Sequence, residues 1–264
     1  MSYFLVIKHL KVNHANVLTS NYAVTATPLM AITLFGHALG ANIDAKNTGV
    51  AVIHHNTRFL SESDRRAGFK KRLFQQRKAA TYIDKNDYSK DSLSLSLQPI
   101  ATAHLFLSLV LEFQTRPDVD RIMKFLQGGR ISGGVIESHG QVAVFHEHDD
   151  AFIDSLPGNG YWLLDRKDLI DPDQPSHSLV NALGSTQESW LTPVVAGYAL
   201  TTQPISQIKG VRSLPDGSFV DHAFVEPLLG LAQYVSIRQY SDFEIPFWRN
   251  SWKSDTLFIA SIND

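Results

Sequence analysis

The hydrophobic and polar positions of the first 56 residues follow a strand–helix–strand pattern. Phe4–Val12 is a nearly continuous apolar run, which is typical of a buried strand. Thr27-Pro28 predicts a helix start, with threonine as the N-cap and proline at the first helical position. The helix Leu29–Leu39 is expected to end at a Gly40 cap, and Gly49–His55 predicts a second strand. These lengths predict a βαβ unit with a right-handed crossover.

The pattern beyond residue 92 continues this arrangement. Leu93–Leu97 alternates strictly and predicts a half-exposed strand, whereas Leu105–Phe113 is apolar on both faces and predicts a central strand. A short helix is expected at Asp118–Leu126 after Pro117, followed by a strand at Gln141–Phe145. Together the elements predict an α+β fold with a ferredoxin-like (RRM-like) βαββαβ core, the platform used by RNA-recognition modules.

The remainder of the chain, from residue 146 to 264, is less periodic. The region 165–178 contains prolines and aspartates in close succession and predicts a surface loop. Because 129–146 and 190–200 both have the pattern of strands from one core, we expect a single elaborated domain over 1–264. The elements predicted in this elaborated C-terminal half are strands at Tyr161–Leu164, Val194–Leu200 and Leu257–Ile262 and a helix at Phe224–Tyr234, interrupted near Pro227.

Composition narrows the class of protein. With 44% hydrophobic and 19% charged residues, the 264-residue chain has the composition of a soluble globular protein. The absence of cysteine excludes disulfides and thiolate metal sites. No signal peptide is recognisable, and no apolar stretch reaches the roughly 20 residues of a membrane-spanning helix. A soluble cytoplasmic protein, with no membrane contact, is therefore expected.

The distribution of charge carries more information than its total. The chain has a net charge of −2, yet the segment from 58 to 78 contains eight basic residues and only two acidic ones. A solvated surface could look like this, but a basic segment on an acidic body also fits local contact with a polyanion. Turn-forming residues around it predict a protruding loop or hairpin at 57–91, with Phe69, Phe74 and Gln75 interleaved. The candidate RNA-binding residues are Arg58, Arg65, Arg66, Lys70, Lys71, Arg72, Arg77 and Lys78.

Two further stretches are candidates for RNA contact. The run 128–134 (GGRISGG) is either a turn entering a strand or a glycine-rich loop at which the backbone of Gly128 and Gly129 approaches phosphate, with Arg130 as the cation. It lacks the lysine and the spacing of a P-loop, so nucleotide triphosphate binding is not expected. Asn13 and Asn16, expected just beyond the first strand, are either turn formers or direct contacts.

The histidines raise the question of catalysis. His54 and His55 are adjacent on a strand and should point to opposite faces. The segment 146–150 (HEHDD) could hold a metal ion but has no partner motif, so neither metal nor cofactor is expected. His37, His54 or His104 could act in acid–base chemistry, but their periodicity brings no pair together. We therefore expect no catalytic residue and no enzymatic activity.

An ordered set of short motifs runs along the chain. The motifs are LKVNHAN (10–16), FGHAL (35–39), GVAVI (49–53), SLVLE (108–112), SGGVI (132–136), WLTP (190–193) with GYA (197–199), FVE (224–226) and FWR (247–249). Together they resemble one protein family, the second Csy subunit of type I-F CRISPR surveillance (Cascade) complexes, a Cas-five-type member of the RAMP superfamily. The resemblance implies a subunit that caps the 5′ handle of the CRISPR RNA without cleaving it, for antiviral defence. It also implies contact with a Cas-seven-type backbone subunit, and it allows for a large subunit and target DNA as further partners.

Two alternatives stay open at this point. A RAMP-type endoribonuclease would process precursor CRISPR RNA itself, and cleavage by the purified protein would reveal it. A Cas-seven-type backbone subunit would be present in several copies per particle, whereas a cap is present once.

Overall fold

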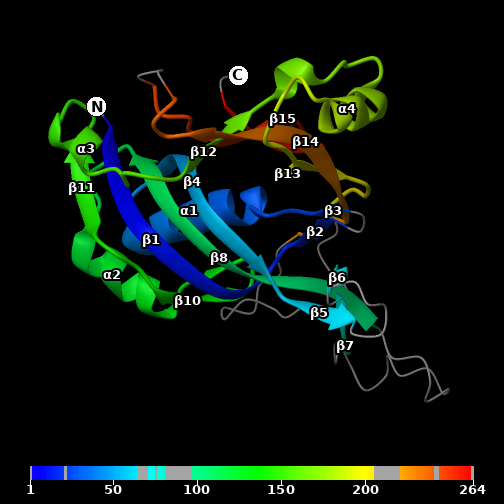
Figure 1. Cartoon of the computed structure of the whole chain (residues 1–264). Helices are drawn as coiled ribbons and strands as arrows, with labels where there is room; N and C mark the ends of the chain where they lie inside the picture. Colours follow the sequence, from blue (N-terminus) through cyan, green and yellow to red (C-terminus); the bar gives the residue numbers. More distant parts are fainter. Residues whose placement is uncertain are drawn as a thin grey trace.

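The computed structural model describes residues 2–20, 23–64, 71–74, 76–80, 97–204, 221–240 and 244–262, with backbone only for those between 61 and 100 (Figure 1). It confirms an α+β protein that consists mostly of antiparallel sheet. The helices are α1 (Leu29–Ile43), α2 (Val119–Gly128), α3 (Ala151–Asp154) and α4 (Pro175–Gly184), with a 3-10 turn η2 (Lys167–Leu169). The strands are β1 (Tyr3–Asn16), β2 (Leu18–Ser20), β3 (Ala23–Val24), β4 (Asn47–Phe59), β5 (Ser61–Asp64), β6 (Lys71–Phe74), β7 (Gln76–Ala80), β8 (Leu97–Phe113), β9 (Arg130–Ile131), β10 (Gly134–Ser138), β11 (Val142–His146), β12 (Tyr161–Asp165), β13 (Leu191–Leu200), β14 (Val225–Ser236), β15 (Arg249–Ser254) and β16 (Leu257–Ser261).

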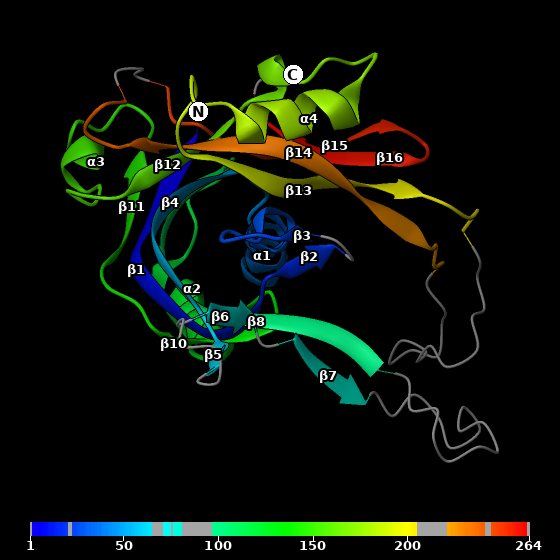
Figure 2. The ribbon, with the colours of Figure 1, turned by 45° about the vertical axis from the view of Figure 1, so that its right-hand side comes forward.

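One large antiparallel sheet organises the molecule. Its strand order is β15-β16-β13-β14-β12-β4-β8-β1-β10-β9, with β11 also paired to β1 and β7 paired to β8. Within it, α1 connects β1 to β4 and α2 connects β8 to β9 and β10. The sheet curls around α1, so that β4 and β8 lie on one side of the helix and β13 and β14 on the other (Figure 2). A backbone bridge between Val50 and Trp248 ties the two sides together.

The first helix departs from its predicted ends. Thr27 is not its N-cap, because the hydroxyl lies 3.0 Å from His54 Nδ1 and 2.8 Å from Tyr234 Oη. The helix also continues past Gly40 to Ile43, and Asp44 takes the left-handed conformation (φ 56°). Gly40 is required by space instead, since a Cβ there would lie 2.6 Å from the carbonyl oxygen of Ala45. Packing against neighbouring elements thus outweighs the local capping signals.

In the C-terminal half one predicted element has the wrong type, and the sequence pattern did not predict α3, η2, α4 or β15. The predicted helix at 224–234 is strand β14, paired with both β12 and β13. Pro227 is tolerated because β12 pairs only with Ala232–Ser236, which leaves β14 with one strand partner at Pro227. The predicted loop 165–178 contains η2 and the start of α4. The strands predicted near 161, 194 and 257 are confirmed as β12, β13 and β16.

The structure describes the whole of the strand predicted at 105–113, but only the last residue of the strand predicted at 93–97. Residues 93–96 lie outside the described part of the chain, and Leu97–Phe113 is one long strand, β8. In the predicted protrusion 57–91, β5 pairs with β6 and β7 pairs with the start of β8. These short strands lie at the end of the sheet where β4 ends and β8 begins (Figure 1).

The core occupies both faces of the sheet. A large cluster under α1 and α2 buries one side chain in two along β1, β4 and β8. A smaller cluster covers part of the opposite face, around Val6, Val110, Phe152 and Trp162. Among the described helices, none has the length and apolar character required to span a membrane. The smaller cluster leaves the rest of this second sheet face uncovered.

Candidate nucleic-acid interface

The central strand β8 defines where the sheet face is open. Its odd-numbered residues from 103 to 111 are buried under the helices, which leaves the even-numbered ones on the other face. On that face Val110 and Ser108 are fully buried, whereas Phe106 and His104 are partly exposed. The face therefore changes from core to open surface at Phe106, toward the end of the sheet that carries β5, β6 and β7.

Cross-strand pairing brings polar groups beside these two rings. Phe106 pairs with Asn56 of β4 on one side and Lys11 of β1 on the other. His104 pairs with Arg58 of β4, and its ring lies 4.9 Å from that of His14 in β1. Because directly opposed residues of antiparallel strands share a face, cations flank the aromatic rings on both sides. This surface, formed by Lys11, His14, Asn56, Arg58, His104 and Phe106, is called the open face below.

A histidine–serine cluster marks the boundary between the open face and the core. The Ser108 hydroxyl accepts a hydrogen bond from the His9 backbone N–H at 2.8 Å and lies 2.7 Å from His55 Nε2. The rings of His9 and His55 are 5.0 Å apart, and both contact Phe106. Bulges in β1 between Ile7 and Leu10, and in β4 beside His55, bring these residues together.

Burial changes the protonation of three histidines. It lowers the pKa of His54 to about 4, with a further contribution from the charge of His55. It lowers the pKa of His55 to about 4 as well, helped by His9. The pKa of His104 is lowered by burial and by the charges of His14 and Arg58, against the opposing effect of Glu137. Neutral rings are therefore favoured near pH 7, which suits stacking and hydrogen bonding.

The structure does not bring together the three histidines that were considered for acid–base chemistry. His54 lies on the helix side with Thr27 and Tyr234, and His37 lines a cleft with Lys46 on the same side. His104 instead pairs with His14, which periodicity alone could not show. As predicted, His54 and His55 point to opposite faces.

The predicted contacts Asn13 and Asn16 lie within β1, so the expectation that they follow the strand is wrong. Asn13 pairs with Val135 of β10 at the margin of the open face. The Asn16 carboxamide oxygen accepts a hydrogen bond from the Leu18 N–H at 3.1 Å, which is the turn-forming role.

The GGRISGG run forms a tight hairpin between β9 and β10. Ser132 and Gly133 both have positive φ (50° and 76°), as the two-residue turn requires. A Cβ at Gly129 would lie 2.9 Å from Ile136, whereas Gly128 has open space around it. The exposed Arg130 guanidinium donates to the Gly133 carbonyl at 3.1 Å. The described contacts therefore give this run a role in the hairpin, and its contact with RNA stays a prediction.

Of the basic segment, only one cation has a described side chain. Arg58 lies on β4, at the edge of the open face. Lys71, Arg72, Arg77 and Lys78 lie on β6 and β7, for which the backbone alone is described. Arg65, Arg66 and Lys70 lie outside the described residues. The segment is thus connected to the open face through β4.

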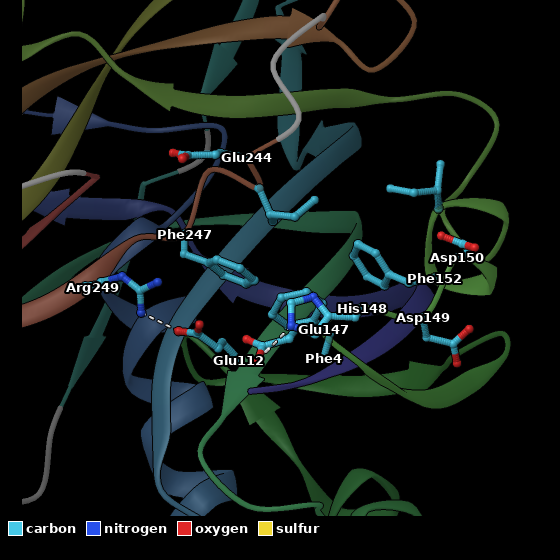
Figure 3. A pocket seen from close by; sticks show the side chains of 12 residues that line it. Phe4, Glu112, Glu147, His148, Asp149, Asp150, Phe152, Glu244, Phe247 and Arg249 are labelled. Atoms are coloured by element: carbon cyan, nitrogen blue, oxygen red, sulfur yellow. Dashed lines mark hydrogen bonds and ion pairs between the residues drawn. The ribbon is translucent and has the colours of Figure 1, made fainter. Parts of the chain in front are cut away.

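The other end of the same face has the opposite charge. A cavity of about 800 Å³ there is lined by three phenylalanine side chains and by carboxylates (Figure 3). Arg249, the arginine among its described lining residues, forms an ion pair with Glu112 and lies 5.5 Å from the centre of the Phe247 ring. Although burial opposes it, hydrogen bonds from Arg249 and Thr48 lower the pKa of Glu112. The carboxylates are Glu112, Glu147, Asp149, Asp150 and Glu244.

The possible metal cluster at 146–150 lies beside this cavity. The rings of His146 and His148 are 5.5 Å apart. Among the residues that the structure describes, no group of three or more histidines and carboxylates is arranged to hold a metal ion.

Sequence reasoning missed Lys11, Asn56 and Phe106. Lys11 and Asn56 are polar residues within strands, which is a weak signal, and Phe106 belongs to a run that is apolar on both faces. Only the pairing of β4, β8 and β1 places them side by side.

Comparison with models of protein families finds a match to this chain. The family model described as CRISPR-associated protein (Cas_Csy2) matches residues 5–183, and this span contains every residue of the open face. No curated protein matches the chain.

Proposed function

The chain belongs to the Cas_Csy2 family of CRISPR-associated proteins, and we propose that it is a non-catalytic subunit that binds CRISPR RNA and caps the 5′ handle of the guide. The family resemblance seen in the sequence, to a type I-F Cascade subunit, is thereby confirmed. The observation that carries the proposal is the open face, where Lys11 and Arg58 flank two partly exposed rings. Cations that flank aromatic groups fit single-stranded RNA, whose phosphates and bases they contact respectively.

The strand order supports a ferredoxin-like core. The four strands β4-β8-β1-β10 are adjacent and antiparallel, with α1 and α2 in the two crossovers. We assign this βαββαβ arrangement to the RRM-like class, with the open face as its RNA platform and the segment 57–91 as an adjoining basic protrusion.

The charges on the sheet face determine at which end of the sheet the RNA binds. Phosphates are attracted to the end with Lys11, Arg58 and the basic segment, and are repelled by the carboxylates around the cavity at the other end. RNA is therefore confined to the end of the sheet near β5–β7. We propose that a Cas-seven-type backbone subunit, and a large subunit where one is present, contact the remaining surface of this cytoplasmic protein.

Salt dependence of binding tests the electrostatic part of the proposal. For a fluorescein-labelled single-stranded CRISPR repeat RNA, log affinity should fall with log salt at about 0.7 per phosphate contact, so five or six contacts give a slope of about −3.5 to −4. The double variant Lys11→Glu/Arg58→Glu should weaken binding at least tenfold and make the slope shallower by about 1.4, which is two contacts by the same rule.

The matched control reverses two lysines on the helix side, Lys46→Glu/Lys124→Glu, so that net charge changes equally. RNA affinity of this control should stay within about twofold of the wild type once long-range charge effects are screened. A wild-type slope shallower than about −1, or equal losses in both double variants, would rule out binding at the open face.

The ribonuclease alternative has one observation in its favour, the His14–His104 pair on the open face. Incubating the same RNA for hours with excess protein, with and without magnesium or manganese, separates the two functions. The proposal expects full-length RNA. Discrete cleavage that disappears in His104→Ala or His14→Ala would assign the chain to the endoribonucleases.

The alternative of a Cas-seven-type backbone subunit is tested by copy number. Native mass spectrometry of the assembled complex would identify such a subunit by several copies of this chain per particle.

A further inference from the structure

Two rings follow one another along β8 on the open face. His104 and Phe106 are separated by Leu105, which is buried on the opposite side of the sheet. Residues two apart on a strand are spaced by about 6.6–6.8 Å, since the rise is roughly 3.3–3.4 Å per residue. Stacked bases follow each other at roughly 3.4 Å. At this spacing one flat ring lying between two side chains is at stacking distance from each of them, and the space between His104 and Phe106 is called the gap below.

Among the described residues, the aromatic rings that contact Phe106 are those of His9 and His55. The imidazole of His9 stacks on Phe106 with ring centres 5.5 Å apart and planes at 19°. The His9 backbone N–H donates to the Ser108 hydroxyl and His55 Nε2 lies 2.7 Å from the same hydroxyl, so both residues are anchored at Ser108, which follows Phe106 along β8 in the direction away from His104. On the far side of the gap, the His14 ring stands at 78° to that of His104.

The walls of the gap carry the groups that a nucleotide needs. Lys11 on β1 and Arg58 on β4 lie on opposite sides of β8, within reach of phosphates that enter and leave the gap. Asn56 sits directly beside Phe106 and has an amide that can both donate to and accept from a base edge. Neither Lys11 nor Asn56 uses its side chain in a hydrogen bond or ion pair within the described structure.

The phenylalanine is held in place before any ligand arrives. His9 and His55 both contact its ring, and both are tied to the fully buried Ser108. His9 has a positive φ of 54°, an unfavourable conformation for a residue with a side chain, which the bulge in β1 imposes. A ring fixed in this way loses little rotational freedom when a base stacks on it, which favours binding.

We propose that the gap between Phe106 and His104 is a binding site for one unpaired nucleobase of the RNA, with Asn56 at the base edge and Lys11 and Arg58 at the phosphates. This inference rests on the proposed function, because the RNA must first be held on the open face. It adds a base contact to what is otherwise phosphate binding.

The test uses the full-length protein and a set of repeat RNAs that each carry 2-aminopurine at one position. This base analogue loses fluorescence when it stacks on an aromatic ring. At saturating protein, one position is expected to be quenched in the wild type and to recover its fluorescence in Phe106→Ala. Affinity for the RNA should fall roughly 5- to 150-fold in this variant, the range for one base–aromatic stack of about 1–3 kcal/mol. The conservative variant Phe106→Tyr should retain both the quenching and the RNA affinity of the wild type.

A matched control and a second measurement make the outcome independent of folding. Trp252 is 59% exposed on β15, outside the open face, so Trp252→Ala should leave the quenching and the affinity unchanged. An RNA with an abasic site at the quenched position should bind the wild type as weakly as Phe106→Ala binds intact RNA. The two changes together should cost no more than either alone, because they remove the same contact.

The experiment distinguishes a failure of the proposed function from a failure of the base-binding site. If the wild type does not bind the RNA at any salt concentration, the proposed function fails and this inference with it. Tight RNA binding without quenching at any position, or quenching that persists in Phe106→Ala, overturns the base site and leaves the proposed function intact. Unchanged RNA affinity in Phe106→Ala combined with loss of a protein partner would assign these rings to a protein contact, which also overturns the base site.

Discussion

At the scale of single residues, neighbouring glycines in the β9–β10 region have different reasons to be glycine. A Cβ at Gly134 would lie 2.6 Å from the backbone nitrogen of Ala15 and 2.7 Å from the Asn13 carbonyl oxygen. These atoms belong to β1, the partner strand, and cannot move without breaking the pairing. Gly128 ends helix α2, and a Cβ at this position would meet no other atom within 4 Å. The sequence presents both residues alike, as parts of one glycine-rich run.

Replacing each glycine by alanine should separate these roles. Gly134→Ala should lower the free energy of unfolding by about 1–3 kcal/mol, because backbone atoms on two strands must shift to admit the methyl group. Gly128→Ala should be neutral or raise it by up to about 1 kcal/mol, since alanine restricts the unfolded chain and favours helix. Urea unfolding of both variants measures the difference. Equal effects at the two positions would contradict this account.

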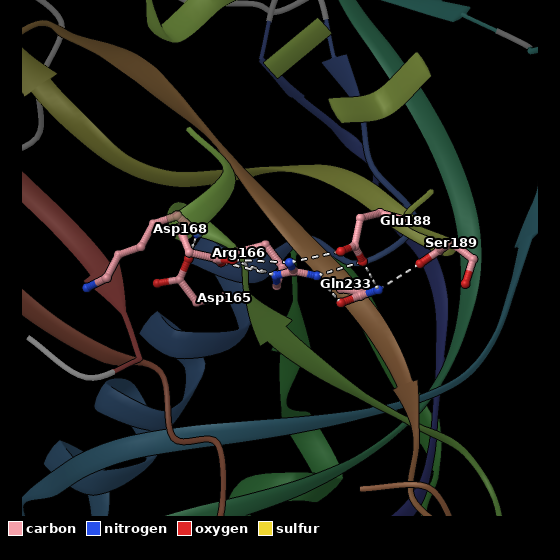
Figure 4. A network of polar contacts seen from close by, with 7 residues as sticks. Asp165, Arg166, Asp168, Glu188, Ser189 and Gln233 are labelled. Atoms are coloured by element: carbon pink, nitrogen blue, oxygen red, sulfur yellow. Dashed lines mark hydrogen bonds and ion pairs between the residues drawn. The ribbon is translucent and has the colours of Figure 1, made fainter. Parts of the chain in front are cut away.

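At the scale of elements, one arginine connects parts of the C-terminal half (Figure 4). Arg166 follows β12, and its guanidinium contacts Asp168 in η2 at 3.0 Å and Glu188 before β13 at 3.1 Å. It also donates to the side chain of Gln233 in β14, which in turn holds the Ser189 carbonyl at 2.9 Å. The Arg166 side chain is 16% exposed, so its charge is largely withdrawn from water and depends on these partners.

Arg166→Met should therefore lower the melting temperature and reduce the free energy of unfolding by about 1–2 kcal/mol, because it removes several hydrogen bonds to charged groups while both carboxylates, Asp168 and Glu188, can still reach water. The matched control is Arg116→Met, since Arg116 is exposed and forms no hydrogen bond or ion pair among the described residues. It should change stability by less than about 0.5 kcal/mol. A loss as large in the control would mean that net charge, and not the network, is responsible.

At the scale of the whole molecule, the curled sheet is joined across α1 by buried polar contacts. Thr27, just before α1, lies within hydrogen-bond distance of both His54 on β4 and Tyr234 on β14. The ring of His54 packs on that of Tyr234 at 4.8 Å. Burial and the neighbouring His55 hold the pKa of His54 at about 4 instead of its usual 6.5. Protonating His54 would thus place a charge between the two sides of the sheet.

Global stability should consequently depend on pH in a defined direction. The folded pKa of His54 lies below the unfolded value, so the unfolded chain binds the proton first as pH falls. The stabilisation that comes from keeping His54 neutral is complete above about pH 6.5 and is lost toward pH 4. From pH 7.5 to pH 5, the contribution of His54 to the free energy of unfolding falls by about 2 kcal/mol. Urea unfolding at these two pH values should show the loss, and His54→Asn should reduce it. His177→Asn, at an exposed position on α4, should not. Equal pH dependence in wild type and His54→Asn would refute this role.

The sequence by itself determined the elements whose signals are local. Periodicity located β1, α1, β4, α2 and most strands of the C-terminal half, and the order of short motifs identified the family. Asp118 begins α2 where expected, accepting hydrogen bonds from Asp120 and Arg121. The concentration of basic residues between 58 and 78 was likewise visible, because composition does not depend on folding.

Tertiary structure decided whatever depends on which strands become neighbours. The segment 224–234 is apolar enough for a helix or a strand, and pairing with β12 and β13 made it a strand. Thr27 was drawn away from the helix terminus by His54 and Tyr234. The open face itself arises from register: Lys11, Asn56 and Phe106 are far apart in the sequence and meet only because the bulges in β1 and β4 fix how these strands lie against β8. Residue patterns specify which side of a strand is buried, whereas cross-strand neighbours are set by contacts between distant segments, which no local pattern encodes.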